Sequence, residues 1–198
     1  MTEAVPTSVR APGDENLPRV RSLIVGSRMM LAANTTLQLT FLFAYLYLRA
    51  NNFGGMWRPG VGTPAPGITL MILLVPVVTT LVLGAAVGVA GRGDRRALTR
   101  ILGPALLLGA ATIAVRVYQL YHTGYDLAAG TYVDIAVIWL AVILAEFVLG
   151  ALWMVSIYNS HVRQTVVASH SHVRALFEYW LYVTVVAVVV SGLIQFVT

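Results

Sequence analysis

A lone acidic residue, Glu146, lies near the middle of the long apolar segment 132–159. A carboxyl group in such surroundings loses its hydration, so it should either carry a proton or hydrogen-bond to a neighbouring segment. No other acidic residue and no histidine is expected at the same depth, so a relay of proton-carrying groups would have a single member. A structural or lipid contact is the simpler interpretation of Glu146, and proton handling stays open beside it.

Two opposite charges, Arg116 and Asp134, lie near the facing ends of two successive apolar segments. Arg116 is about two turns from the end of the segment 98–122, and Asp134 is about one turn into the segment 132–159. A charge in hydrocarbon requires a partner, and these two residues are expected at similar depths. The sequence therefore predicts a structural ion pair, with a proton or substrate path as the alternative.

Other polar side chains in the apolar segments are expected to hold helices together. Asn34 and Gln38 are four residues apart, so they share one face of the segment 29–50 and can hydrogen-bond to a neighbouring helix. Glu178 follows Arg174 by four residues at the start of the segment 174–197, which predicts an ion pair on the helix surface. Contact of Glu178 with a partner subunit is the alternative interpretation.

The residue types that usually hold a redox cofactor are not spaced for that task. The chain has no Cys, and its four His lie at the ends of apolar segments or between them: His122, His161, His170 and His172. Haem inside a membrane bundle is normally held by His residues within the spans. No phosphate-binding, nucleophile-elbow or metalloprotease motif occurs either. The sequence thus predicts no catalytic, cofactor-binding or metal-binding residue in this chain.

Composition and segment length indicate the elements that carry these residues. Of the 198 residues, 58% are hydrophobic and 11% are charged, a balance that suits a bilayer better than water. Five segments have the roughly 20 apolar residues that a helix needs to cross a bilayer: 29–50, 67–90, 98–122, 132–159 and 174–197. The sequence predicts an all-α membrane protein with five transmembrane helices over residues 28–198, after a flexible cytoplasmic tail over residues 1–27.

The arginines predict the orientation of these helices. All 13 basic residues are Arg, and most lie before the first apolar segment or in the second and fourth connections. Cytoplasmic ends carry such an excess, so the N-terminus is expected inside and the C-terminus outside, in a bacterial-type plasma membrane. Because the arginines are spread in small groups between apolar runs, no nucleic-acid partner is expected.

Four stretches of the apolar segments have distinctive sequences. The first segment ends in LFAYLYLRANNFGGMWRPG (Leu42–Gly60), an aromatic helix end followed by a loop with Gly, Trp and Pro. The third segment ends in VYQLYHTGYD (Val117–Asp126), and the last two contain FVLGALW (Phe147–Trp153) and EYWLYV (Glu178–Val183). These stretches resemble the corresponding helix ends and last two helices of subunit III of the haem–copper terminal oxidases in its five-helix form. The likeness covers about residues 28–198.

Individual family positions fall on residues named here. Gln119 stands where the family has a Glu before the Tyr of the third span, and Asn34 or Thr35 stands at the Glu of the first. One of the family's paired His in the fourth span falls near Glu146, whereas Trp180 matches the family's Trp in the last span. These departures indicate a divergent member.

The resemblance implies a subunit without redox centres of its own. In that family the helices form two groups around a V-shaped cleft that holds phospholipid, and the subunit packs against catalytic subunit I, which carries haem and copper. We therefore expect a non-catalytic membrane subunit of the cytochrome c oxidase type, which stabilises the catalytic subunit in aerobic respiratory electron transport. The polar residues named above are then candidate lipid or subunit contacts. An accessory subunit of another respiratory complex such as a nitric oxide reductase, and a small membrane transporter, are the alternatives.

Overall fold

The computed structural model describes residues 17–51, 66–122, 131–162 and 170–196. These residues form five helices, in chain order α1 (Leu17–Ala50), α2 (Pro66–Gly91), α3 (Arg95–His122), α4 (Thr131–Val162) and α5 (His170–Phe196). Each contains one of the five predicted apolar segments, apart from a residue or two at the ends. The described part of the chain is therefore all-α.

Five described helices are long and apolar enough to cross a membrane. Large apolar side chains cover much of their outer surface. Among them Met29, Phe43, Leu81 and Leu107 are 68% to 75% exposed. Such a surface is unfavourable in water, whereas lipid chains solvate it. The protein is thus a multi-pass membrane protein with five candidate spans, as the sequence predicts.

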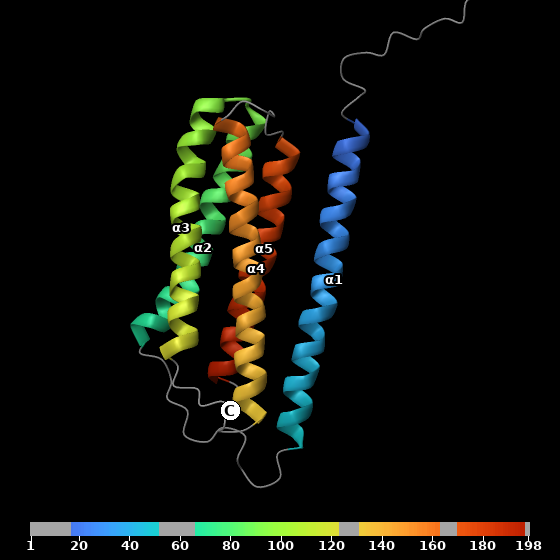
Figure 1. The fold of residues 1–198 in the computed structure, drawn as a ribbon, viewed down its shortest axis with the longest axis vertical. Coiled ribbons are helices and arrows are strands. Elements are labelled where there is room, and N and C mark those ends of the chain that lie inside the picture. The colour runs from blue at the N-terminus through green and yellow to red at the C-terminus, as the bar shows by residue number, and fades with distance from the viewer. Residues whose placement is uncertain (1–16, 52–65, 123–130, 163–169, 197–198) are drawn as a thin grey trace, which may run out of the picture.

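Helices α2 to α5 form a four-helix bundle, and α1 lies against one side of it (Figure 1). Contacts join α2 to α3, α3 to α4, α4 to α5 and α5 to α2, so these four helices enclose a common core. Among the described elements, α1 contacts α4 and α5 alone. The starts of α1, α3 and α5 lie at one end, at the top of Figure 1, because successive helices alternate in direction. We call this the Arg-rich end; it carries Arg21, Arg28, Arg92, Arg96, Arg100 and Arg174.

The start of α1 differs from the prediction. Residues 17–27, which the sequence assigned to the flexible tail, are helical, so that boundary is wrong. Pro18 lies in the first turn of α1, where a backbone N–H has no partner inside the helix and a proline removes no hydrogen bond. Arg19 and Arg21 follow it, and Arg is a good helix former. The rest of the predicted tail, residues 1–16, lies outside the described residues.

The connection between α2 and α3 shows why α2 ends at Gly91. Gly93 has a φ of 72°, a left-handed conformation that favours glycine. Its N–H donates a hydrogen bond to the carbonyl oxygen of Ala90 over 3.2 Å. Asp94 then caps α3, because its Oδ1 accepts a hydrogen bond from the N–H of Ala97 over 3.0 Å. The turn therefore reverses the chain within a few residues and sets α2 and α3 antiparallel.

Trp180 of α5 is the largest contribution of that helix to the core. Its side chain is fully buried, and its ring centroid lies 5.4 Å from that of Phe147 on α4. Glycines on α3 and α4 make room for its ring inside the bundle. A Cβ atom at Gly150 would lie 2.9 Å from Cε3 of Trp180, and one at Gly109 would lie 3.4 Å from its Cη2. The sequence therefore places small residues where α3 and α4 meet the bulkiest side chain of α5.

Candidate functional site

Glu146 is buried at the junction of α1, α4 and α5, where it accepts a hydrogen bond from α1. The donor is Nε2 of Gln38, which lies 2.6 Å from Oε1 of Glu146. The Oε1 atom of Gln38 accepts a second hydrogen bond, also over 2.6 Å, from the indole N–H of Trp139. All three side chains are buried. We call them the Gln38 cluster; it contains the interhelical hydrogen bond expected for Glu146 and for Gln38.

The indole determines which way the Gln38 amide points. An indole N–H can only donate, so the carbonyl oxygen of Gln38 must face Trp139. The amide nitrogen then faces Glu146, whose Oε1 can accept this hydrogen bond with or without a proton on its other oxygen. That other oxygen, Oε2, is buried and has no hydrogen-bond partner among the described residues. The cluster therefore contains one buried carboxyl oxygen that can still form a hydrogen bond.

Three further polar residues surround the Glu146 carboxyl. The Tyr179 hydroxyl on α5 donates a hydrogen bond to the backbone carbonyl of Glu146 over 2.9 Å. Asn34 lies one turn before Gln38 on α1 and interacts with the same carboxyl group. The Tyr182 hydroxyl is buried and has no hydrogen-bond partner in the described parts of the chain. The arrangement can hold three helices together by hydrogen bonds, and it offers a single carboxyl group that could take up or release a proton.

Arg116 of α3 is buried in the half of the bundle away from the Arg-rich end. Its Nη1 donates hydrogen bonds to Oε1 of Gln119 over 3.0 Å and to Oγ of Ser191 over 3.2 Å. Its guanidinium carbon lies 5.8 Å from the centroid of the Phe147 ring. Its Nε and Nη2 are buried and have no hydrogen-bond partner within the described ranges. Among the described residues only neutral groups hold this cation, so no opposite charge within those ranges offsets its desolvation cost.

The expected ion pair between Arg116 and Asp134 does not form. The hydrogen bonds of Arg116 go to its own helix and to α5, whereas the Asp134 side chain is exposed on α4. Tyr132 and Val133, the two residues before Asp134, are buried. One residue turns a side chain by about 100° around a helix, so similar depth does not bring two residues face to face.

The remaining predicted site residues, Glu178, Trp180 and Gln119, take part in contacts within and between the helices. Nε of Arg174 lies 2.9 Å from Oε1 of Glu178, so the predicted ion pair on the helix surface is confirmed. Trp180 is packed in the core, and its Nε1 has no hydrogen-bond partner among the residues described. Gln119 accepts the hydrogen bond from Arg116 and is likewise buried. Glu178, Trp180 and Gln119 therefore all lie outside the Gln38 cluster.

Three partners of these residues were missed from sequence. Trp139 precedes Glu146 by seven residues, about two helical turns, so both lie on one face of α4. That spacing was a usable signal. Tyr179 and Ser191 act from α5, and no local pattern indicates that they meet Glu146 and Arg116 respectively. Only the assembly of α3, α4 and α5 around one bundle core brings these pairs together.

Neither a metal centre nor a family assignment emerges from the described chain. No group of three or more His, Asp or Glu side chains is placed there to hold a metal ion. No protein-family model matches the chain, and no curated protein matches it. Of the stretches that resemble oxidase subunit III, residues 52–60 and 123–126 lie outside the described residues. The function of the chain must therefore be inferred from its own residues and surfaces.

Proposed function

We propose that the chain is a non-catalytic integral-membrane subunit of a haem–copper terminal oxidase, and that it stabilises the catalytic subunit during aerobic respiratory electron transport. The local resemblance to subunit III and the five candidate spans support this proposal. The observation that carries it is the outer face of α1, which has the character of a helix–helix interface but has no neighbour in the described chain.

Helix α1 is far less enclosed than the other helices. Only 11% of its most apolar stretch is buried, against 28% to 44% in α2 to α5. The face that meets α4 and α5 contains Ser27, Gln38 and Tyr45, all buried. The residues of the opposite face are exposed from Ser22 to Phe43. A helix that packs against the bundle with one face and exposes the other can connect the bundle to a second protein.

The open face of α1 carries mainly small and hydroxyl side chains, together with Met29 and Phe43, at alternating spacings of three and four residues. We call it the outer stripe; its exposed members are Ser22, Gly26, Met29, Ala33, Thr36, Thr40 and Phe43. The hydroxyls of Thr36 and Thr40 donate hydrogen bonds to backbone carbonyl oxygens of the preceding turn, so they lie close to the helix and project little from its surface. Small residues let helix backbones approach closely in lipid, where apolar bulk alone brings no gain. The outer stripe thus suits a transmembrane helix of the catalytic subunit.

The remaining parts of the proposal follow from the resemblance. Haem and copper would belong to the partner, since the chain itself has no Cys and its His residues lie at helix ends or between helices. The Arg-rich end would face the cytoplasm, with the N-terminus inside and the C-terminus outside a bacterial-type plasma membrane. The two helix groups around a lipid cleft would correspond to α1 on one side and the α2–α5 bundle on the other.

Gentle detergent extraction tests the proposal. The chain should elute with a larger subunit that shows a haem spectrum, and the identity of that subunit separates an oxidase from a nitric oxide reductase. Ala33→Leu, in the outer stripe, should lose most of the co-eluting haem because the added side chain holds the helices apart. Ala110→Leu makes the same change at an exposed position of α3 and should retain it. A chain that elutes alone and monodisperse from its native membrane would contradict the proposal.

A further inference from the structure

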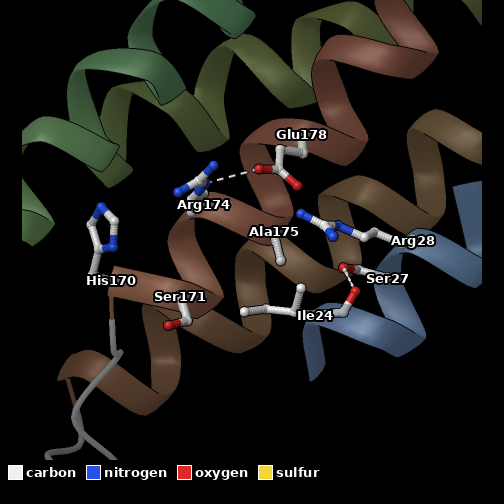
Figure 2. Close-up of a pocket in the computed structure, with 8 residues that line it drawn as sticks. All are labelled: Ile24, Ser27, Arg28, His170, Ser171, Arg174, Ala175 and Glu178. Atoms are coloured by element: carbon white, nitrogen blue, oxygen red, sulfur yellow. Dashed lines mark hydrogen bonds and ion pairs between the residues drawn. The ribbon is translucent and has the colours of Figure 1, made fainter. Parts of the chain in front are cut away.

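A pocket at the Arg-rich end separates the first turns of α1 from the start of α5 (Figure 2). Ile24 and Arg28 belong to its wall on α1, whereas Arg174, Ala175 and Glu178 belong to its wall on α5. Each wall therefore has an apolar side chain beside a charged one. The pocket has a volume of about 130 Å³. This corresponds to roughly four water molecules, so a small movement of α1 is enough to close it.

The charged side chains across the pocket are only partly paired. Nε of Arg174 lies 2.9 Å from Oε1 of Glu178, whereas Oε2 of Glu178 makes no hydrogen bond with a described residue. Arg28 extends from α1 toward this pair in Figure 2, yet it makes no hydrogen bond and no ion pair with any described residue. A carboxylate can accept hydrogen bonds on both of its oxygens, so Glu178 has one oxygen left for the Arg28 guanidinium.

The polar links between α1 and the bundle lie away from this pocket. They are the hydrogen bonds of the Gln38 cluster and the one from the Tyr45 hydroxyl to α5. Within the described chain, residues 17–33 of α1 make no side-chain hydrogen bond to another helix. Arg28 precedes Gln38 by ten residues, about 15 Å along the helix, so a tilt of about 10° at Gln38 moves Arg28 by roughly 3 Å. Residues 17–33 can therefore approach α5 while the Gln38 cluster stays intact.

We propose that α1 has a second, closed position, in which Arg28 forms an ion pair with Glu178 and the pocket disappears. In that position Glu178 accepts hydrogen bonds from Arg174 on its own helix and from Arg28 on α1, and Ile24 packs against Ala175. The Glu178 side chain is 35% exposed, so this ion pair is partly screened and α1 exchanges between the open and closed positions. Because the outer stripe is on α1, closure changes the tilt of that stripe. The movement itself needs only α1 and α5, and it does not depend on the proposed oxidase partner.

The rate of disulfide formation in the double variant Ile24→Cys, Ala175→Cys measures how often the two walls meet. The chain has no Cys of its own, so the full chain in detergent forms no competing disulfide. Two cysteines can join only when their Cα atoms come within about 7 Å. In this parent variant, Arg28→Gln and Glu178→Gln should each slow disulfide formation about twofold to fivefold, which is the range for an exposed ion pair. Salt at about 1 M should slow the parent variant to the same extent and should leave Arg28→Gln unchanged.

An exchange of the two charges and a charge outside the pocket provide the controls. Arg28→Glu combined with Glu178→Arg restores opposite charges across the pocket, so it should form the disulfide faster than Arg28→Glu alone. Arg21→Gln removes the same charge about two turns away on α1, at an exposed position outside the pocket, and should leave the rate unchanged. Equal rates for Arg28→Gln and the parent variant would overturn the proposal, as would equal slowing by Arg21→Gln. So would the absence of any disulfide in the folded parent variant, because the two walls would then never meet.

Discussion

Replacing Gln38 by leucine removes the main polar link between α1 and the bundle. The substitution deletes both hydrogen bonds of the Gln38 amide, each 2.6 Å long. It leaves the indole N–H of Trp139 without its acceptor, and it leaves Oε1 of Glu146 without its donor. Oε2 of Glu146 already lacks a hydrogen-bond partner among the described residues, so the carboxyl would keep only its interaction with Asn34. Two buried polar groups would lose partners at one position.

The size of the effect follows from these two losses. A buried group without a partner costs about 1–3 kcal/mol in soluble proteins. Hydrogen bonds between membrane helices contribute about 0.6 kcal/mol on average and about 1.7 at most. Short bonds to a carboxyl group and an indole belong near the upper limit, so we expect Gln38→Leu to lower the free energy of unfolding by about 2–3 kcal/mol. For a chain of this length, that corresponds to a fall of roughly 4–12 °C in the midpoint of thermal unfolding.

Thermal unfolding of the detergent-purified chain, followed by tryptophan fluorescence, measures this fall. Glu146→Gln keeps an acceptor for Nε2 of Gln38, so its midpoint should stay within about 2 °C of wild type. Thr36→Val is the matched polar-to-apolar change on α1, since the Thr36 hydroxyl is exposed and bonds only to the backbone of Ala32. It should also be nearly neutral. A Gln38→Leu midpoint no lower than that of Thr36→Val would refute the reasoning, because the buried amide would then contribute nothing to the packing of α1.

Two further predictions concern the core of the bundle. Gly150→Ala places a Cβ atom 2.9 Å from a ring carbon of the buried Trp180, so it should destabilise the chain by about 1–3 kcal/mol in the same unfolding assay. The control Gly88→Ala meets no atom within 4 Å and should be neutral or stabilising. Arg116→Met removes a buried charge without an acidic partner in the described chain, so the free energy of unfolding should not fall by more than about 1 kcal/mol. A loss of about 3 kcal/mol or more would instead indicate that an anion accompanies Arg116 in the folded protein.

The spans were predictable from sequence, whereas the contacts between them were predictable only in part. Long apolar runs are specific for membrane helices because a helix must satisfy its own backbone in lipid, so five segments predicted five helices. Depth along each segment was also readable, and it placed Glu146 and Gln38 in the interior. Rotation about each helix axis was not readable: Arg116 and Asp134 were expected at a similar depth, but Arg116 is buried and Asp134 is exposed. The partners Tyr179 and Ser191 depend on the same rotation, which only the assembled bundle fixes.

The rotation of α1 about its axis determines both the face that packs against the bundle and the face that carries the outer stripe. In lipid, apolar contact between helices brings little net gain, so close packing and hydrogen bonds determine how α1 is turned. Gln38 bonds two residues of α4 at once, and Tyr45 adds a hydrogen bond to the carbonyl oxygen of Leu193 on α5. A shift by one residue would turn α1 by about 100° and would direct a different set of side chains outward. The Gln38 cluster therefore does more than attach α1 to the bundle. By fixing the rotation of α1, it keeps the small residues of the outer stripe facing away from the bundle, where a partner helix can pack against them.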